Sequence, residues 1–230
     1  MSRNNFPYLA VANQVYQPPL KPPLGRLPHI STQSLFKRSL DILGACVGLV
    51  ILGFLFIPTA IAIRLDSKGP ILYSQERYGL QGKPFTIWKF RSMVVNADEL
   101  KASVANESEG LIFKNETDPR ITKVGQVLRK TSLDEFPQFW NVLIGEMSLV
   151  GTRPPTADEV AHYNERHWQR LDVRPGMTGQ WQVNGRSAIK DFEDIVTLDL
   201  DYQALWTPIY DVQLILKTVV TLLSKRSGAC

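Results

Sequence analysis

The sequence predicts an α+β protein with one membrane-length helix, a short β-hairpin and several further helices. Residues 42–63 are an uncharged apolar run of about 22 residues, which as a helix would reach roughly 33 Å. Residues 70–78 and 83–91 are β-rich, and a glycine-containing loop separates them. These two observations define the membrane segment and the hairpin, and most of the remaining chain has helical spacing.

The N-terminal segment, residues 1–33, holds six of the fifteen prolines and lacks the apolar stretch of a signal peptide. We expect it to be a Pro-rich disordered tail. Residues 34–66 then form the membrane helix, and residues 67–230 form the domain that follows it. No internal repeat divides this domain.

The membrane run has two interpretations. Basic residues flank both of its ends, so the positive-inside rule gives no direction. Pro58 lies inside the run and would kink a helix there. These features fit a helix that enters and leaves on one side, but a spanning helix that tolerates its proline fits equally well.

The elements of the remaining chain follow from local patterns. A capping-box spacing at 156–159 opens one helix. The last helix is apolar and could belong to the core or lie on the membrane surface. In order, we expect a short helix at 96–105, a turn at 118–120 before a helix through 128, a helix from 156 to about 171, a glycine-rich loop at 174–186, and helices at 192–202 and 211–223.

Composition limits the classes of partner. The 230 residues carry a net charge of +4, and the pI is about 9.1. This excess fits nucleic acid, an anionic membrane surface or a phosphorylated substrate, but no nucleic-acid recognition motif is present. Cys46 lies in the apolar run and Cys230 is the last residue, so we expect neither a disulfide nor a zinc site.

Two adjacent carboxylates, Asp134 and Glu135, are the strongest candidates for chemistry. Adjacent side chains on a helix point in different directions, so the two acids would have different roles. The structural alternative is a capping box from Ser132 to Glu135, and a helix that starts at Pro137 is as plausible. In either case the pair lies near a helix N-terminus, which suits a phosphate.

Four cations are candidate phosphate ligands. Arg129 precedes the acidic pair and could hold a phosphate with its planar fork. Lys89 and Arg91 are two apart on a predicted strand and would share a face, although a solvated basic edge explains them too. Arg153 lies in a rigid turn before two prolines.

Several of these segments together resemble the bacterial sugar transferase family of monotopic phosphoglycosyl transferases. The resemblance runs from about residue 36 to the C-terminus and leaves out the Pro-rich tail. The motifs that carry it occur in the family's order at 64–70, 88–93, 118–120, 131–141, 145–154 and 174–179.

The resemblance implies a reaction in which a sugar 1-phosphate moves from a UDP-sugar to undecaprenyl phosphate and UMP is released. It assigns the covalent phosphosugar intermediate to Asp134 and Mg²⁺ binding to Glu135. Arg129 and Arg153 match positions that hold phosphate, Lys89 matches a basic position of the active site, and Arg91 is an addition of our own. A carboxylate can attack a diphosphate only when the negative charge of the diphosphate is masked, and the Mg²⁺ that the family uses would provide this.

The resemblance also implies a small monotopic membrane enzyme with a re-entrant membrane helix, several amphipathic interfacial helices and a catalytic domain at the cytoplasmic face of the bacterial inner membrane. The family's helix breaks at a Ser-Pro pair, whereas Pro58 follows Ile57 here. The partners implied are a UDP-sugar (glucose or galactose), undecaprenyl phosphate and membrane lipids, but no nucleic acid; a homodimer is left open. The alternative function is an inactive membrane scaffold of a polysaccharide assembly complex.

Overall fold

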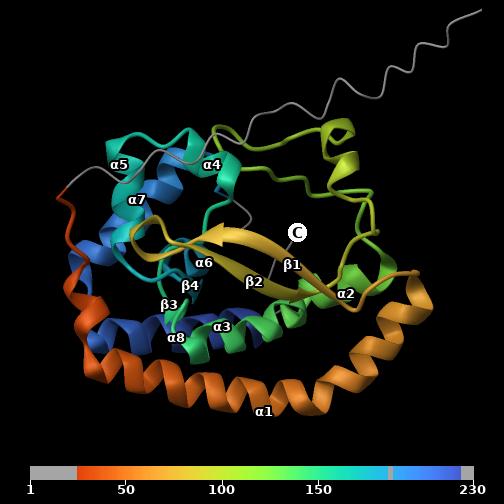
Figure 1. The fold of residues 1–230 in the computed structure, drawn as a ribbon, viewed down its shortest axis with the longest axis horizontal. Coiled ribbons are helices and arrows are strands. Elements are labelled where there is room, and N and C mark those ends of the chain that lie inside the picture. The colour runs from red at the N-terminus through yellow and green to blue at the C-terminus, as the bar shows by residue number, and fades with distance from the viewer. Residues whose placement is uncertain (1–24, 186–188, 224–230) are drawn as a thin grey trace, which may run out of the picture.

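The computed structural model describes residues 25–185 and 189–223, and it confirms the mixed helix-and-strand class (Figure 1). One long apolar helix comes first, a small antiparallel hairpin follows, and short helices fill most of the rest. The elements are η2 Ile30–Gln33, α1 Leu35–Asp66, β1 Leu72–Tyr78, η3 Leu80–Gly82, β2 Pro84–Phe90, η4 Glu99–Ser103, α2 Lys123–Lys130, η5 Leu133–Gln138, α3 Phe139–Ile144, β3 Ser148–Val150, α4 Ala157–Ala161, α5 Glu165–Trp168, η6 Gln169–Asp172, β4 Gly176–Thr178, α6 Gln180–Val183, α7 Phe192–Leu205 and α8 Pro208–Leu223.

Helix α1 contains the whole apolar run. Ser34 caps its first turn by accepting a hydrogen bond from the Lys37 backbone N–H. Pro58 lies inside the helix, and Figure 1 shows α1 changing direction in its second half, which contains this proline. Among the described residues, α1 is the helix that is long and apolar enough to cross a membrane, and most of its apolar window is unburied.

Buried polar contacts fix the N-terminal half of α1 to the domain. Lys37 Nζ donates to Asp211 Oδ2 and to the Val150 carbonyl, both at 2.8 Å. Asp41 Oδ1 accepts from Ser148 Oγ and from the Leu149 N–H, again at 2.8 Å. Because buried charges need such partners, these bonds hold the helix against β3 and α8.

The C-terminal half of α1 is fixed to the same domain through apolar packing. Ile63 is buried in a cluster with Phe90 of β2 and Leu128 of α2. The rings of Phe56 and Phe90 lie 5.6 Å apart. Beyond them, Asp66 Oδ2 accepts from the Val124 N–H at 2.9 Å. In Figure 1 the domain accordingly lies along one side of α1.

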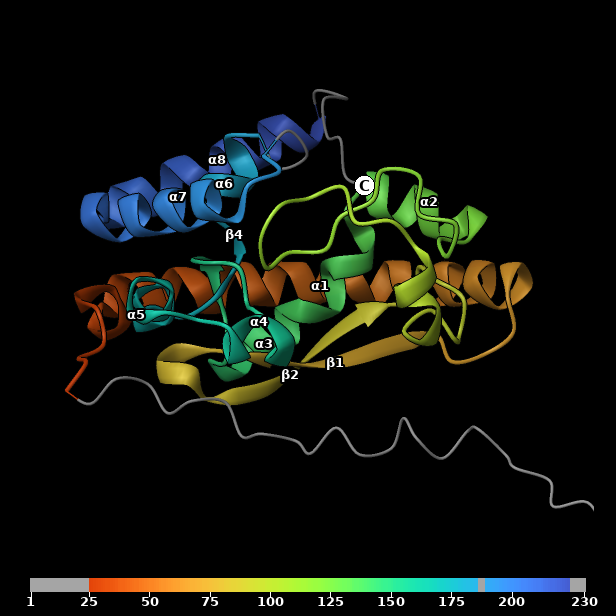
Figure 2. The same ribbon diagram turned by 90° about the horizontal axis from the view of Figure 1, so that it is seen from above.

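The predicted hairpin is confirmed. Strands β1 and β2 pair antiparallel, with Gln75 opposite Ile87 and Tyr78 opposite Pro84. The connection is tight, and Gln81 takes a left-handed conformation at φ 55°. Figure 2 shows the hairpin on one side of α1 and helices α7 and α8 on the other.

The glycine-rich loop expected at 174–186 is partly regular in its described residues. Ser148 of β3 pairs in parallel with Gly176 of β4, and α6 follows directly. A Cβ on Gly176 would lie 2.1 Å from the Gly151 nitrogen, so the close approach of these backbones requires glycine. The pairing joins distant parts of the chain, which a local pattern does not show.

Other boundaries also differ from the expectations. The capping box at Thr156 is confirmed, but α4 ends at Ala161 because Asn164 caps a new helix, α5. Of the short helix expected at 96–105, only the 3-10 turn η4 is present. Most of the Pro-rich tail lies outside the described residues. Its last part packs on the domain instead, where the Arg26 side chain pairs with Asp172 and Ser31 is buried.

Candidate active site

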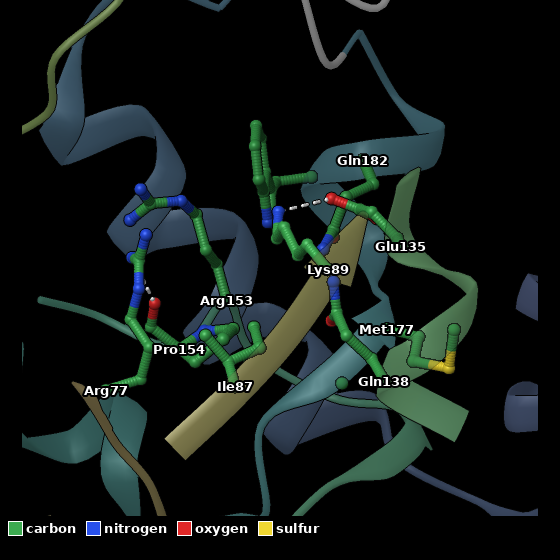
Figure 3. A pocket seen from close by; sticks show the side chains of 11 residues that line it. Arg77, Ile87, Lys89, Glu135, Gln138, Arg153, Pro154, Met177 and Gln182 are labelled. Carbon is green, nitrogen blue, oxygen red and sulfur yellow. Dashed lines mark hydrogen bonds and ion pairs between the residues drawn. The ribbon is translucent and has the colours of Figure 1, made fainter. Parts of the chain in front are cut away.

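A pocket of ≈ 120 Å³ opens where β1, β2, η5, β4 and α6 converge (Figure 3). Three cationic side chains and one carboxylate line it. The lining residues are Arg77, Ile87, Lys89, Glu135, Gln138, Arg153, Pro154, Gly176, Met177, Trp181 and Gln182.

The backbone of η5 explains how the acidic pair is divided. A 3-10 helix has three residues per turn, so residues three apart share a face. Glu135 and Gln138 both line the pocket, whereas Asp134 and Pro137 are buried on another face. The two acids therefore point in different directions, as predicted.

Neither prediction for the start of this helix is correct. Ser132 takes a left-handed conformation at φ 55° and its side chain makes no capping hydrogen bond, so the capping box does not form. The 3-10 helix spans Leu133–Gln138 with Pro137 inside it, and α3 begins only at Phe139. Asp134 and Glu135 occupy the first turn of η5.

Lys89 and Glu135 form an ion pair inside the pocket. Lys89 Nζ lies 2.9 Å from Glu135 Oε1, and both side chains are part-exposed. Lys89 is on the same face of β2 as the buried Ile87, which directs it toward η5. The predicted basic residue thus lies directly beside the predicted metal ligand.

Arg153 and Arg77 form the cationic end of the pocket (Figure 3). Arg153 Nη1 contacts both carboxylate oxygens of the buried Glu159, at 3.0 and 2.9 Å. Burial would raise the pKa of Glu159, but the Arg153 charge and hydrogen bonds outweigh it and lower that pKa. Burial, and then repulsion from Arg153, lowers the pKa of Arg77 to about 10. Arg77 therefore stays charged at neutral pH.

Arg129 lies outside the pocket lining but near Asp134. Its Nε donates to Ser92 Oγ at 3.0 Å. Burial lowers the pKa of Arg129, and the charge of Asp134 opposes this effect. Arg129 and Asp134 therefore share one electrostatic environment behind the pocket wall.

Arg91 does not join the site. It follows the last residue of β2 and is buried, and its guanidinium donates to Ser67 Oγ and to the carbonyls of Ser67, Lys68 and Pro70. Every nitrogen of the guanidinium is used in closing the connection between α1 and β1. Because its donors are already engaged with the α1–β1 connection and it does not line the pocket, the role of Arg91 as a phosphate ligand stays a prediction without support from the pocket geometry.

Four buried polar atoms that line the pocket have no hydrogen-bond partner in the described structure: Arg77 Nε, Gln138 Nε2, Trp181 Nε1 and Gln182 Oε1. Buried polar atoms are normally paired, so this concentration indicates a site for a polar ligand. Sequence reasoning missed all four residues. The three-residue spacing of Glu135 and Gln138 could have revealed Gln138, but tertiary packing alone brings Arg77 and α6 here.

A Mg²⁺ ion fits this donor set only with help from a substrate. The described residues include no group of three acidic, His or Cys side chains that could hold a metal. Glu135 supplies one carboxylate to the pocket. Mg²⁺ typically binds through one or two carboxylates plus substrate phosphates, so a single pocket carboxylate is compatible with it.

The fold and site define a protein with one membrane-length apolar helix and a pocket lined by three cationic side chains and one carboxylate. The family model described as bacterial sugar transferase matches residues 32–225. The chain belongs to the bacterial sugar transferase family, which confirms the resemblance seen in its motifs.

Three relatives illustrate the match. The Galactosyl transferase CpsE of Streptococcus agalactiae serotype III (strain NEM316) is 51% identical over 189 residues, which cover 81% of this chain and 42% of the relative. The UDP-glucose:undecaprenyl-phosphate glucose-1-phosphate transferase of Escherichia coli (strain K12) is 39% identical over 208 residues, 86% of this chain and 42% of the relative. The Exopolysaccharide production protein ExoY of Rhizobium meliloti (strain 1021) is 36% identical over 198 residues, 84% of this chain and 87% of the relative.

The chain spans about two fifths of the length of the first two relatives, at 42% of each. It spans most of the third, at 87%. The residues matched by the family model, 32–225, contain the membrane-length helix α1 and the pocket.

Proposed function

We propose that this protein transfers a sugar 1-phosphate from a UDP-sugar to undecaprenyl phosphate and releases UMP, as the first membrane step of exopolysaccharide or capsule synthesis. The observation that carries the proposal is the division of the acidic pair on η5. Glu135 faces a cationic pocket, while Asp134 lies beside Arg129. The names of the relatives supply the sugar-nucleotide donor and the lipid acceptor.

In the proposed first step, a carboxylate oxygen of Asp134 attacks the β-phosphorus of the UDP-sugar. The bond between that phosphorus and the bridging oxygen breaks, and UMP leaves with the bond's electrons. In the second step, a phosphate oxygen of undecaprenyl phosphate attacks the same phosphorus and releases the Asp134 carboxylate. A covalent nucleophile accelerates a transfer because it divides one difficult step into two easier steps.

The cations of the site have distinct proposed roles. Arg77 and Arg153 bind the diphosphate at the cationic end, where Glu159 holds Arg153 in place. Lys89 neutralises the charge that develops as UMP leaves. Arg129 favours the ionised form of Asp134 by its positive charge. Asp134 is buried, so we expect donor binding to shift η5 side chains and open a path to it.

Mg²⁺ is the proposed cofactor, and Glu135 would hold it together with phosphate oxygens of the donor. A bound Mg²⁺ would mask negative charge on the diphosphate. In this structure Glu135 Oε1 accepts a hydrogen bond from Lys89 Nζ. A metal ion bound at Glu135 would compete for this oxygen, so Lys89 would leave Glu135 and turn toward the phosphates.

We further propose a monotopic arrangement at the cytoplasmic face of the inner membrane. Support comes from the two anchors of α1: Lys37 and Asp41 near one end and Ile63 near the other are all buried against the same domain. A helix that crossed the bilayer would carry one of these ends away from the domain. The exposed apolar residues of α1 and α8 would then face lipid.

The experiment that tests the reaction compares Asp134→Asn with the wild type in lipid nanodiscs. UMP release is measured with UDP-glucose or UDP-galactose, undecaprenyl phosphate and Mg²⁺. We expect a loss of about 1,000-fold or more, because the variant lacks the nucleophile. Without the lipid acceptor, the wild type should retain β-³²P label after denaturation, and Asp134→Asn should not.

Asp158→Asn is the matched control, since Asp158 is exposed and outside the pocket. It should release UMP at the wild-type rate. Unchanged UMP release in Asp134→Asn would contradict the proposal, and so would protein-bound label in that variant. An inactive scaffold would show neither activity nor label in the wild type.

A further inference from the structure

The two arginines and the two glutamines of the pocket lie on opposite sides. Figure 3 shows Arg77 and Arg153 together on one side, and Gln138 and Gln182 on the other side with Lys89 and Glu135. Gln138 comes from η5 and is only 3% exposed. Gln182, with Trp181 before it, comes from α6. We call Gln138, Trp181 and Gln182 the amide wall.

The amide wall presents unused hydrogen-bonding atoms to the pocket. Gln138 Nε2 and Trp181 Nε1 are donors without an acceptor, and Gln182 Oε1 is an acceptor without a donor. Leaving such buried atoms unpaired costs free energy, so the arrangement is expected only where a ligand pairs them. The helix that carries two of these residues is held in place, because Gln180 Oε1 accepts from the Tyr210 hydroxyl at 2.9 Å.

We propose that the amide wall binds the hydroxyl groups of the donor's sugar and so selects which sugar 1-phosphate is transferred. The proposal rests on the proposed function above. A hydroxyl both donates and accepts, so several hydroxyls on one ring can satisfy two donors and one acceptor. A phosphate would instead favour the side that carries Arg77 and Arg153.

The position of the wall favours the sugar over the uracil base. In the proposed reaction the attacked phosphorus carries the sugar directly, whereas ribose and a second phosphate separate it from uracil. Gln138 is one 3-10 turn from Glu135 and shares its pocket-facing side of η5, whereas Asp134 lies on another face. Because Glu135 would hold Mg²⁺ together with the donor's phosphates, the uncharged side chains beside it lie close to the phosphate that carries the sugar.

The test uses the full chain in nanodiscs and two substitutions that remove single groups. Trp181→Phe removes the Nε1 donor but keeps a ring, and Gln182→Met removes the amide but keeps the length. Asn184→Ala is the control, because Asn184 caps the C-terminal end of α6 outside the pocket. We measure kcat/KM for UDP-glucose, UDP-galactose and UDP-N-acetylglucosamine, and the Kd for UDP by calorimetry.

Each wall variant should lower kcat/KM for the preferred sugar about 10-fold, the usual effect of one lost hydrogen bond. The ratio of kcat/KM between the glucose and galactose donors should change at least about 5-fold, and the Kd for UDP by less than about 2-fold. The control should match the wild type. An equal loss of UDP affinity would overturn the proposal in favour of a uracil or phosphate contact, and unchanged sugar ratios would also overturn it.

Failure of the proposed function gives a different result. If the wild type releases no UMP from any UDP-sugar, calorimetry still compares UDP-sugars with UDP. A Kd that depends on the sugar in the wild type, and not in Trp181→Phe or Gln182→Met, supports the amide wall without any turnover. A wild type that binds UDP-sugars and UDP equally overturns it.

Discussion

Two arginines near the site, Arg77 and Arg91, differ in what their guanidinium groups contact. Arg77 lines the pocket with an unpaired Nε, while its Nη1 donates to the Pro154 carbonyl and its Nη2 to Gln75 Oε1. Arg91 instead lies outside the lining and donates to three backbone carbonyls between α1 and β1. We expect Arg77→Ala to raise the KM for the UDP-sugar about 10- to 100-fold, by removing a phosphate contact. Initial-rate measurements at varied donor concentration check this.

Arg91→Ala is the contrasting variant. It should change kcat/KM of the folded protein by less than about 3-fold, because Arg91 does not reach the pocket. Its free energy of unfolding should fall by about 3 kcal/mol, since three backbone carbonyls and the Ser67 hydroxyl lose their donor. Denaturant titration in detergent measures this fall. A large rise in KM for this variant would instead support the predicted role of Arg91 as a phosphate ligand.

Glu159 makes the stability of the site depend on pH. Burial acts to raise its pKa, but the Arg153 interaction outweighs burial, so the folded-state pKa lies below the usual value near 4.3. A carboxyl of this kind stabilises the fold above its unfolded pKa, and that contribution disappears as pH falls through the folded pKa. Glu159→Gln leaves Arg153 without its buried partner and should cost about 3 kcal/mol at pH 7.

The difference between the wild type and Glu159→Gln should therefore shrink as pH falls from 7 to about 3. Thermal unfolding at a series of pH values measures it. A difference that stayed constant over this range would show that the charge of Glu159 does not stabilise the fold.

At the scale of elements, two glycines let α1 pack closely against the domain. A Cβ on Gly48 would lie 2.3 Å from the Phe139 ring of α3, and one on Gly44 would lie 2.5 Å from Leu149. The same addition at Gly53 meets nothing within 4 Å. Gly48→Val should lower the unfolding temperature by several degrees, because the valine side chain would clash with the Phe139 ring and force α1 or the ring to move.

Gly53→Ala is the control and should leave the unfolding temperature unchanged or raise it slightly, since alanine favours a helix. Both variants are measured by circular dichroism in the same detergent. Equal effects of the two would mean that α1 does not pack against α3.

Local sequence patterns predicted the helices and strands whose hydrogen-bond partners are close in sequence. β-rich composition on both sides of a glycine-containing loop located β1 and β2, and the Thr156 cap located the start of α4. The end of α4 was missed because the competing cap at Asn164 was not recognised. Strand β4 was missed because its partner, β3, is distant in sequence and no periodicity marks a pairing of three residues.

The sequence predicted the residues of the candidate site that lie in recognisable motifs and missed those that only tertiary packing brings to the pocket. Lys89, Glu135 and Arg153 line the pocket as expected, because each lies in a motif with its own signal. Arg77 and Gln182 reach the pocket only through the packing of β1 and α6, so no local pattern contains them. Arg91 shows the converse: its charge and spacing are those of a ligand, but its donors are used by the backbone.

At the scale of the whole molecule, the anchoring of α1 predicts where both of its ends lie. Lys37 pairs with Asp211 near the first turn, and Asp66 accepts from the Val124 N–H at the last. Because both contacts belong to one domain, we expect the tail and residue 68 on the same, cytoplasmic, side. Ser2→Cys and Lys68→Cys, each in a background with Cys46 and Cys230 replaced by serine, test this.

A membrane-impermeant maleimide is applied to intact spheroplasts and to inverted membrane vesicles. Both cysteines should react in the vesicles and stay unlabelled in the spheroplasts. A spanning helix would place them on opposite sides, so that one of the two reacts in spheroplasts. The topology decides how the two substrates reach the pocket. With both ends of α1 in the cytoplasm, the nucleotide sugar enters the pocket from water, and the exposed apolar residues of α1 and α8 hold the protein at the membrane surface, where the lipid phosphate lies.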